Sequence, residues 1–199
     1  MSAPRRIVVG ISGASGVIYG VRILEALREA GIETHLVMSR SAEITLAHET
    51  SLKVEDVRAL ANQWYLQTDI GAAIASGSFQ TSGMIVAPCS IRSMSEIATG
   101  VTAGLLTRAA DVTLKELRRL VLMVRETPLH LGHLRTMTRL AEMGAVLAPP
   151  MPAFYAQPET LKDMIDQSVG RVLDLFGVET FLVHRWKDNK PHAGYKPGI

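Results

Sequence analysis

The sequence predicts a single α/β domain with a doubly wound, Rossmann-like or flavodoxin-like parallel sheet and helices on both faces. Short, continuously apolar runs rich in β-branched residues recur along the chain, as expected of strands that are buried on both faces. Segments with apolar residues at helical spacing alternate with these runs. With 199 residues, of which 47% are hydrophobic and 20% charged, the chain is long enough for about one domain and apolar enough to bury a core.

The amino-terminal half alternates between strand and helix signals. Two apolar runs predict strands, which cover residues 6–12 and 33–38. Helical spacing of apolar residues predicts helices, which cover residues 17–30, 41–48 and 54–63. The stretch 69–80 is rich in Gly, Ala and Ser and has weak periodicity, so we expect a loop there.

The carboxyl-terminal half continues the alternation. Further strands are predicted over residues 83–89, 120–124 and 145–148, and further helices over residues 90–99, 105–118, 131–143 and 161–176. Ser93 and Glu96 stand at the spacing of a capping box. Pro149, Pro150 and Pro152 predict a stiff, extended connection before the last helix. We assign residues 1–183 to the domain and residues 184–199 to a basic tail.

Composition argues against several classes of protein. A formal net charge of +2 and an aromatic content of 5% argue against a nucleic-acid partner. No apolar run reaches the length of about 18 residues that a transmembrane helix needs, and no signal peptide is evident, so we expect a cytoplasmic protein without a membrane partner. Cys89 is the single cysteine, which excludes an intrachain disulfide. His130 and His133 lack a nearby carboxylate or Cys partner, so we expect no metal site.

Small, polar or charged residues follow the predicted strands. Ligands of open parallel sheets bind at the carboxyl ends of the strands, so these residues are candidates for a site. They are Gly13, Ala14, Ser15 and Gly16 after the first strand, Ser39 after the second, Ser90, Ile91, Arg92 and Ser93 after the third, Arg125 and Glu126 after the fourth, and residues 149–155 after the fifth.

The turn after the first strand suits a phosphate or another anion. Its glycines, Gly10, Gly13 and Gly16, do not have the spacing of the dinucleotide fingerprint, and no Lys-Ser/Thr pair follows as in a P-loop. A small-residue turn with a hydroxyl, Ser15, at a helix amino terminus can bind an anion, but it can equally be an ordinary tight turn. The turn at Ser90 has the same two interpretations, helix cap or phosphate site.

Charged residues mark three further positions. Arg125 and Glu126 directly follow an apolar strand, so they must lie at the sheet edge or in a cleft. Arg108 and Lys115 are seven residues apart on one predicted helix and therefore point to the same side. Glu49 ends a predicted helix, where the macrodipole disfavours an acidic residue.

Several segments together resemble the UbiX/Pad-type flavin prenyltransferases, a family of homo-oligomeric flavoproteins. The matching segments run in family order from residue 6 to about residue 176 and are Gly13-Ala-Ser-Gly16, Val37-Met-Ser39, His48-Glu-Thr50, Pro88-Cys-Ser90, Arg108-Ala-Ala-Asp-Val112, Leu114-Lys-Glu116, Leu122–Leu129 and Pro150–Tyr155. The Arg-Glu-x-Pro-Leu and Pro-x-Pro-x-Phe-Tyr motifs are specific, whereas the Gly-Ala-Ser-Gly turn alone is a weak signal.

The resemblance implies a reaction and its partners. A dimethylallyl group would be transferred from dimethylallyl phosphate, or from the diphosphate, to N5 and C6 of reduced FMN without a metal. The prenylated FMN would then serve a UbiD-type decarboxylase. Family members assemble as dodecamers with each site at an interface between chains, so a dodecameric homo-oligomer is implied here too.

The family pattern also implies roles for individual residues. FMN would be bound by Gly13, Ala14, Ser15, Ser39, Ser90, Ile91, Arg92, Ser93 and Arg125. The phosphate of the prenyl donor would be bound by Lys115, Arg125, Glu126, Tyr155 and Arg171. Catalytic roles are implied for Ser15, Glu49, Glu126, Lys115 and Arg108. Among these, Glu49 with Ser15 as relay would carry the acid–base work, and the fixed cations would stabilise charge on the leaving phosphate.

One departure from the family pattern and two alternative functions stay open. The family usually has Lys-Glu-Arg-Arg-Pro where this chain has Lys115-Glu-Leu-Arg-Arg119, so the local backbone is not predicted. One alternative is an FMN-dependent decarboxylase, although the Asn-rich motif and the His of cysteine decarboxylases are missing at residues 88–92. The other is a non-catalytic flavin-carrier subunit of an aromatic-acid decarboxylase system. The choice of donor, and of ubiquinone synthesis or aromatic-acid decarboxylation as the pathway, is also open.

Overall fold

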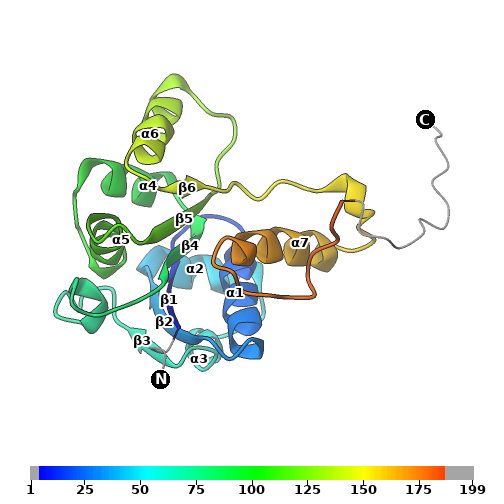
Figure 1. Ribbon diagram of the computed structural model, residues 1–199, viewed down its shortest axis with the longest axis horizontal. Helices are drawn as coiled ribbons and strands as arrows, with labels where there is room; N and C mark the ends of the chain where they lie inside the picture. The colour runs from blue at the N-terminus through cyan, green and yellow to red at the C-terminus, as the bar shows by residue number, and fades with distance from the viewer. Residues whose placement is uncertain (1–4, 187–199) are drawn as a thin grey trace.

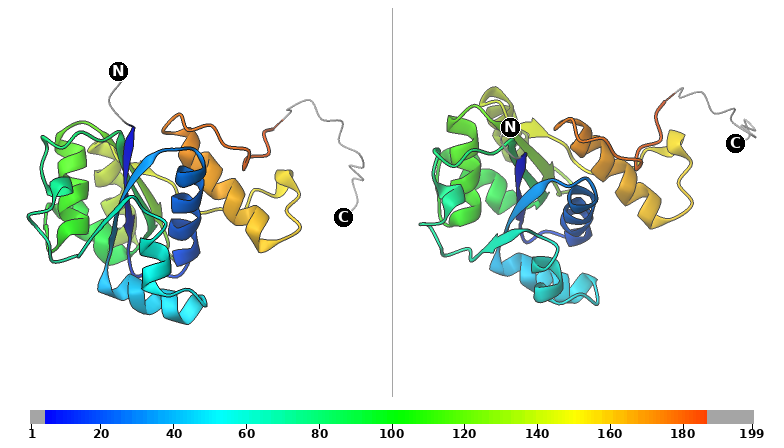
Figure 2. Two further views of the ribbon diagram at one scale, coloured as in Figure 1. Left: turned by 90° about the horizontal axis from the view of Figure 1, so that it is seen from below. Right: turned by 60° about the horizontal axis from the view of Figure 1, so that its bottom comes forward.

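A computed structural model describes residues 5–186 and shows a parallel sheet between two layers of helices (Figures 1 and 2). The strands are β1 (Arg6–Ile11), β2 (Glu33–Met38), β3 (Gln63–Tyr65), β4 (Gly83–Cys89), β5 (Arg119–Val124) and β6 (Val146–Leu147). The helices are α1 (Val17–Glu29), α2 (Arg40–Glu49), α3 (Val54–Arg58), α4 (Ile91–Thr99), α5 (Leu105–Lys115), α6 (Leu131–Glu142) and α7 (Leu161–Asp174), with the short 3-10 helices η1 (Ala73–Ala75) and η2 (Phe154–Ala156).

Successive residues of the central strands pack on opposite faces of the sheet. Ile7, Val9 and Ile11 of β1 belong to the core cluster that includes α1 and α7, whereas Val8 belongs to the cluster that includes α4 and α5. Every residue of β4 is buried. Helices therefore cover both faces, which explains why the strands are continuous apolar runs in the sequence. The predicted fold class is confirmed.

The strand order places a crevice at the carboxyl ends of the two central strands. The order is β3-β2-β1-β4-β5-β6, and each neighbouring pair is parallel. After β1 the chain builds outward to β2 and β3, and then returns past β1 to build β4, β5 and β6 on the other side. Connections leave β1 and β4 in opposite directions, so the carboxyl ends of these two strands flank the ligand-binding crevice of this kind of sheet.

The region after α2 differs from the sequence prediction. The helix predicted over 54–63 ends at Arg58, and residues 63–65 form the edge strand β3, which pairs with β2. Three residues are too few to produce a periodic signal, and their position is decided by the neighbouring strand. The predicted loop 69–80 is mostly irregular but contains η1.

The ends of two other elements also differ. The helix predicted over 105–118 ends at Lys115, and Leu117 adopts a left-handed conformation with a φ angle of 54°. This conformation ends the helix and directs the chain into β5, which begins at Arg119. The strand predicted over 145–148 contains only Val146 and Leu147.

The predicted capping box at Ser93 and Glu96 is wrong. Ser90 is the N-cap of α4, because its Oγ accepts a hydrogen bond from the backbone N–H of Ser93 at 3.2 Å. Glu96 instead accepts a hydrogen bond from the side chain of Arg92 at 2.8 Å. Spacing alone did not distinguish the cap, which needs the extended backbone found at Ser90, from a residue inside the first turn.

The last part of the chain leaves the sheet and then returns to it. After β6 the proline-containing segment runs away from the sheet to η2, and α7 then packs on α1 (Figures 1 and 2). Arg22 of α1 donates a hydrogen bond to Asp166 of α7 at 2.6 Å, and both side chains are only 12% exposed. Of the predicted basic tail, residues 187–199 lie outside the described residues.

Candidate active site

A cleft of about 630 Å³ opens at the carboxyl ends of the strands. Its lining comes from the turns that begin α1, α2 and α4, from the residues after β3 and β5, and from α5 with the loop before it. The lining residues are Gly13, Ala14, Ser15, Ser39, Arg40, Ser41, Gln67, Ser90, Ile91, Arg92, Ser93, Glu96, Ala103, Thr107, Arg125 and Glu126. A helix amino terminus carries partial positive charge and N–H groups without an intrahelical partner. Three such termini at one cleft favour an anionic ligand.

All residues that the sequence predicted as FMN ligands line this cleft. They are Gly13, Ala14, Ser15, Ser39, Ser90, Ile91, Arg92, Ser93 and Arg125. They come from turns that are up to about 110 residues apart in the chain, and the parallel sheet brings the carboxyl ends of their strands together.

The turn after β1 needs its two glycines for different reasons. A Cβ on Gly13 would overlap the side chain of Ser41 and lie 3.0 Å from the Ser41 carbonyl carbon, so no other residue fits. Gly16 has a φ angle of 94°, which side chains other than hydrogen disfavour. The turn therefore brings backbone close to the start of α2 and leaves the cleft floor open.

A buried hydroxyl that sequence reasoning missed joins the turns after β1 and β4. Ser12 Oγ donates a hydrogen bond to the Pro88 carbonyl and accepts one from the Ser90 N–H, both at 2.8 Å. Ser12 is 1% exposed. These two bonds hold the Ser90 turn at a fixed distance from the Gly13 turn, so both sides of the cleft are positioned before a ligand binds.

The two serines that begin helices act as caps. Ser39 Oγ accepts a hydrogen bond from the Ala42 N–H at 3.1 Å, and Ser90 Oγ accepts one from the Ser93 N–H. Ser90 also donates to the hydroxyl of Ser93 at 3.2 Å. The capping interpretation therefore holds for these side chains, while each still lines the cleft and leaves a hydroxyl at its surface.

Glu49 points back toward the start of α1. Its carboxylate accepts hydrogen bonds from the backbone N–H groups of Gly16 at 2.8 Å and Val17 at 3.1 Å. The N-cap residue of α1, Gly16, has no side chain to do this. The acidic residue that ends α2 against its dipole is thus stabilised by the positive end of another helix.

Glu49 is held in its ionised form next to Ser15. Burial alone would raise the pKa of Glu49, but hydrogen bonds from the Ser15 side chain and from the two backbone N–H groups, together with the charge of Arg125, lower it below its ordinary value. A carboxylate hydrogen-bonded to a hydroxyl that lines the cleft can accept a proton through that hydroxyl. This is the one acid–base pair that the structure assembles from the residues predicted as catalytic.

Arg125 and Glu126 lie at the mouth of the cleft. The Arg125 N–H donates to the Cys89 carbonyl at 3.0 Å, which extends the pairing of β4 and β5 by one residue. The Glu126 carboxylate accepts a hydrogen bond from the Thr127 N–H at 3.0 Å. Both side chains are exposed, in keeping with the prediction that charges after this strand lie at an edge or in a cleft.

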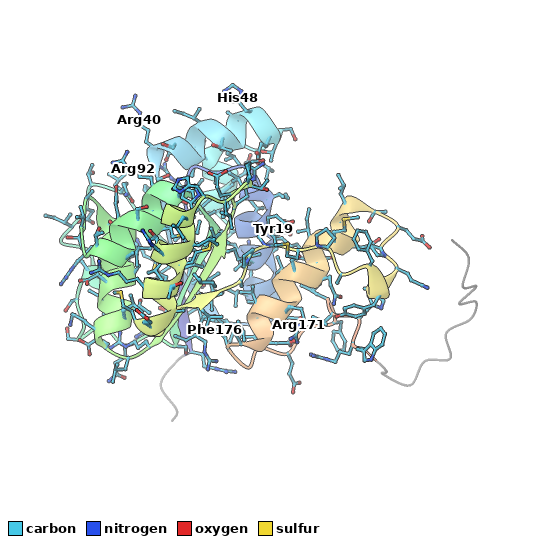
Figure 3. All side chains as sticks on the ribbon, turned by 90° about the horizontal axis from the view of Figure 1, so that it is seen from above. Tyr19, Arg40, His48, Arg92, Arg171 and Phe176 are labelled. Carbon is cyan, nitrogen blue, oxygen red and sulfur yellow. The ribbon has the colours of Figure 1, made fainter. Side chains whose placement is uncertain are left out.

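Sequence reasoning missed six lining residues of the cleft, namely Arg40, Ser41, Gln67, Glu96, Ala103 and Thr107. Arg40 begins α2 directly after Ser39, and Figure 3 shows it on the same side of the molecule as Arg92 of α4. Gln67 follows β3, and its side-chain carbonyl accepts a hydrogen bond from the Leu106 N–H at 3.2 Å. Gln67 was missed because β3 itself was missed, whereas Arg40 could have been found from its position after the second strand.

Tyr155 and Arg171 lie in a second hollow. This hollow has a volume of about 340 Å³ between the segment after β6 and α7, and it shares no lining residue with the cleft. The Tyr155 hydroxyl accepts a hydrogen bond from the Gln167 amide at 3.1 Å, and Arg171 donates to Asp174 at 2.8 Å. Figure 3 shows Arg171 on α7, well away from Arg40 and Arg92.

Arg108 and Lys115 occupy a third place, beside η1. Arg108 donates to the Asp111 carboxylate at 2.7 Å and to the Ala75 carbonyl at 3.3 Å, and Lys115 pairs with Glu116. Neither cation lines the cleft or the second hollow. The residues predicted to meet the donor phosphate are therefore divided among three places on one chain.

The remaining nucleophile and ligand candidates add no site. Burial raises the pKa of the Cys89 thiol to about 12, so this cysteine stays protonated and fills space. Within residues 5–186, no group of three or more His, Cys, Asp or Glu side chains could hold a metal ion. None of the helices in that range has the length and apolar character needed to cross a membrane.

Comparison with known proteins assigns the chain to a family. The sequence profile of the Flavoprotein family matches residues 1–173. Flavin prenyltransferase UbiX of Thauera aromatica is 59% identical over 185 residues, which cover 93% of this chain and 95% of the relative.

Two solved structures share the fold. The crystal structure of AnUbiX (PadA1) in complex with FMN and dimethylallyl pyrophosphate has a TM-score of 0.91 and 49% identity, covering 92% of this chain and 98% of that one. A dodecameric FMN-dependent Ubix-like decarboxylase from Escherichia coli O157:H7 has a TM-score of 0.90 and 49% identity, covering 92% and 99%. Given this similarity along almost the whole chain, the protein belongs to the UbiX-type flavin prenyltransferases of the Flavoprotein family.

Proposed function

We propose that this protein joins a dimethylallyl group from dimethylallyl phosphate or diphosphate to N5 and C6 of reduced FMN. The observation that carries the proposal is the ionised Glu49, hydrogen-bonded to Ser15 beside a cleft with three helix amino termini. A flavin-binding protein without chemistry to perform would need the cleft but not this acid–base pair. The relative at 59% identity is named a flavin prenyltransferase.

The cleft fits FMN as the acceptor substrate. Its volume lies within the range of roughly 300–1,000 Å³ that is common for small-molecule sites. The amino termini of α2 and α4, with Arg40 and Arg92, suit the FMN phosphate, and Gly13 lets the backbone approach the ligand closely. FMN supplies the two atoms, N5 and C6, that receive the new bonds.

Glu49 and Ser15 would handle the proton that leaves C6. A proton in the cleft passes to the Ser15 oxygen while Ser15 passes its own proton to Glu49. The lowered pKa makes Glu49 a weak base, which suits the C6 proton because bonding of the allylic cation to C6 would make that proton strongly acidic. The two backbone N–H groups that hold the carboxylate keep it in place throughout.

The cations would stabilise the leaving phosphate. When the allylic C–O bond of the donor breaks, its electron pair leaves with the phosphate, and negative charge grows there. Arg binds such a group through two parallel N–H donors and Lys through a point charge. We infer that Arg108 and Lys115 of one chain meet Arg125, Glu126, Tyr155 and Arg171 of others.

An assembly of chains is what brings the three places together. One related solved structure, 49% identical, is described as dodecameric. The region that carries Tyr155 exposes large apolar side chains that a partner chain would cover, namely Met151, Phe154, Leu161 and Phe181. We therefore propose a dodecamer in which each site lies between chains.

The remaining features of the proposal concern the cell. Residues 1–183 would form the catalytic domain and residues 184–199 a basic tail. The protein would act in the cytoplasm and pass prenylated FMN to a UbiD-type decarboxylase, without a membrane or nucleic-acid partner.

The alternative functions are less favoured. An FMN-dependent decarboxylase of the cysteine type is less favoured, because its Asn-rich motif and its His are missing at residues 88–92. A flavin carrier would not need Glu49 and Ser15 in contact. Relatives at 59% identity are named as prenyltransferases.

Mass spectrometry tests the proposal. Purified protein is incubated anaerobically with reduced FMN and with each prenyl donor in turn, and the flavin is then extracted. We expect a flavin that is heavier by one isoprene unit with at least one donor. Recovery of unmodified FMN alone with both donors would rule out the prenyltransferase activity.

A further inference from the structure

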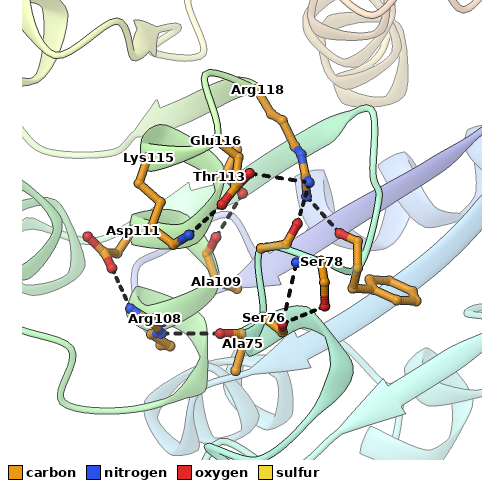
Figure 4. A network of polar contacts seen from close by, with 12 residues as sticks. Ala75, Ser76, Ser78, Arg108, Ala109, Asp111, Thr113, Lys115, Glu116 and Arg118 are labelled. Carbon is orange, nitrogen blue, oxygen red and sulfur yellow. Dashed lines mark hydrogen bonds and ion pairs between the residues drawn. The ribbon is translucent and has the colours of Figure 1, made fainter.

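Arg118 ties a loop to the end of α5 (Figure 4). Its guanidinium donates to the carbonyl of Gly77 and to the carbonyl of Phe79, both at 2.7 Å. The side chain is only 17% exposed, so water competes little for these bonds. Segment 75–79, which begins at the last residue of η1 and leads toward the strand β4, is thereby fixed against α5.

The fixed segment lies against the Lys115–Glu116 pair at Gly77. A Cβ on Gly77 would overlap the Glu116 carboxylate and lie 2.7 Å from the Lys115 ammonium. Glu116 lies 3.9 Å from Arg118 as well, so it faces one cation on each side. The hydrogen bond and charge of Lys115 hold the pKa of Glu116 below its ordinary value.

The same segment also holds the other cation of α5. Arg108 donates from its Nε to the Ala75 carbonyl at 3.3 Å and from its Nη1 to Asp111 at 2.7 Å. Figure 4 shows Arg108 and Lys115 along one side of α5, with Ala75 beside Arg108 and with Glu116 between Lys115 and Arg118. The segment therefore lies next to both cations: it accepts a hydrogen bond from Arg108 at Ala75 and lies against the Lys115–Glu116 pair at Gly77.

We propose that Arg118 is a positioning residue for the prenyl donor: by anchoring segment 75–79, it holds Arg108 and Lys115 in the geometry that binds the donor phosphate. This inference rests on the proposed function, in which these two cations meet that phosphate. Arg118 itself lines neither the cleft nor the second hollow and acts through the segment. Small displacements of phosphate-binding cations are costly because binding and catalysis depend on their position.

A purely structural role would have different consequences. The Arg118 network shares no residue with the lining of the cleft, so a local positioning effect leaves FMN affinity unchanged. General loss of structure would lower FMN affinity and donor affinity together. A fall in donor affinity alone therefore indicates positioning, whereas a fall in both donor and FMN affinity indicates a general loss of structure.

The first experiment compares two neighbouring arginines. Arg118→Gln removes both bonds to the segment, and Arg119→Gln is the matched control because Arg119 lies over Phe176 at 6.0 Å, away from the segment. For Arg118→Gln we expect the donor KM to rise about ten-fold and kcat to fall several-fold, because the displaced cations also stabilise charge on the leaving phosphate, with the Kd for FMN within about two-fold of wild type. Arg118→Lys, which can reach one carbonyl but not both, should give an intermediate KM, and Arg119→Gln a wild-type KM.

The second experiment displaces Lys115 without touching Arg118. In Gly77→Ala the added methyl group meets the flexible ends of Glu116 and Lys115, so the side chains can move aside and the fold can persist. The control is Gly71→Ala in the same loop, where the nearest atom, an Asp69 carboxylate oxygen, is 3.7 Å away. Gly77→Ala should raise the donor KM by several-fold, on the order of the Arg118→Gln effect, and Gly71→Ala should not.

A binding measurement separates this inference from the reaction. Inorganic pyrophosphate is titrated calorimetrically into each full-length variant loaded with oxidised FMN, which needs no turnover. We expect Arg118→Gln and Gly77→Ala to bind it about ten-fold more weakly than wild type and the controls. Wild-type affinity in both variants, or an equal fall in FMN affinity, would overturn the positioning role even if the protein proves to make no prenylated FMN.

Discussion

The cleft at the sheet edge and the hollow beside α7 differ in how much of each a single chain completes. In the cleft, Ser39 and Ser90 cap two helices, Glu49 holds the start of a third, and Ser12 ties two of the turns together. In the hollow, Arg171 of α7 lies opposite Tyr155, which belongs to a segment whose other large side chains, such as Met151 and Phe154, are more than two-thirds exposed.

The difference follows from what lies beneath each region. Short turns that leave adjacent parallel strands are held by the ladder of the sheet, so their side chains are positioned before ligand binds. The segment after β6 leaves the sheet and is attached to the rest mainly through α7, where Asp166 meets Arg22 of α1. Under the proposed function, one chain would build the acceptor site and leave the donor site to be completed by another.

The largest expected effect breaks the chemistry within the cleft. In Glu49→Gln we expect kcat to fall by about 100- to 1,000-fold, because the carboxylate no longer accepts the proton relayed by Ser15. FMN should still bind within about two-fold of wild type, since the Gln oxygen can accept from Gly16 and Val17 N–H groups. Prenylated FMN is followed by mass spectrometry and FMN binding by fluorescence.

A glutamate on the same helix supplies the control for that variant. Glu43 of α2 pairs with Arg58 at 3.0 Å and does not line the cleft, so Glu43→Gln should keep wild-type turnover. Unchanged turnover in Glu49→Gln would remove Glu49 from the mechanism.

The next largest effect is expected when the contacts between chains are broken, because the cleft of each chain is then separated from the hollow of its partner. In the double variant Phe154→Ser and Phe181→Ser, two exposed aromatic residues lose the apolar area that a partner chain would bury. We expect the solution mass measured by light scattering to fall and turnover to drop on the order of 100-fold, while FMN binding persists. An unchanged mass would show that this surface does not hold the chains together.

A third variant tests the attachment of α7. Asp166→Asn leaves Arg22 with less charge compensation in a nearly buried place, so we expect the free energy of unfolding to fall by about 3 kcal/mol at neutral pH. Burial alone would raise the pKa of Asp166, but hydrogen bonds from Lys162 and Arg22 lower it. The stability from this carboxylate is therefore present above its ordinary pKa of 3.8 and is lost as the pH falls through the lower folded value.

Denaturant unfolding at several pH values measures that contribution. The difference between wild type and Asp166→Asn should be largest at neutral pH and shrink progressively below the ordinary pKa of 3.8. Asp69→Asn serves as the control, because Asp69 has no ion-pair partner within residues 5–186. A difference that stays constant down to the lowest pH would show that the charge is not what attaches α7.

The smallest expected effect comes from removing a single oxygen atom, the hydroxyl of Tyr155. Tyr155→Phe removes a hydroxyl that is proposed to bind the donor phosphate, so we expect the donor KM to rise about ten-fold, or about 1.4 kcal/mol, with FMN affinity unchanged. Gln167 still donates to the His184 carbonyl at 3.2 Å, which preserves the local fold. Loss of FMN affinity in this variant would contradict the division between the two regions.

Much of the fold could be predicted because long, regular elements leave a signal in the sequence. The apolar runs of β1, β2, β4 and β5 were found because both faces of each strand are buried. The edge strand β3 was not found, because its three residues pair with β2 through backbone groups and only partly enter the core. The end of α5 was misplaced because Leu117 takes a left-handed conformation that glycine usually marks.

The candidate site was predictable to the extent that it follows strands directly. Ser39, Ser90 and Arg125 were found from that rule, and they line one cleft. Ser12 was missed because it is the last residue of the first predicted strand and was counted as part of that strand. Gln67 was missed because it follows a strand that was not recognised. The contact of Glu49 with the start of α1 depends on how α2 packs, which the spacing of residues does not show.

By itself, the sequence determined the alternation of strands and helices, the chemistry present at the strand ends and the family resemblance, because periodicity and short motifs are local properties. Only the tertiary structure decided that Glu49 is ionised beside Ser15, that Arg118 anchors the loop next to Lys115, and that the residues proposed to bind the donor are divided among three places. The reason is physical: hydrogen bonds, ion pairs and pKa values depend on which groups packing brings within a few ångströms, and these groups come from distant parts of the chain.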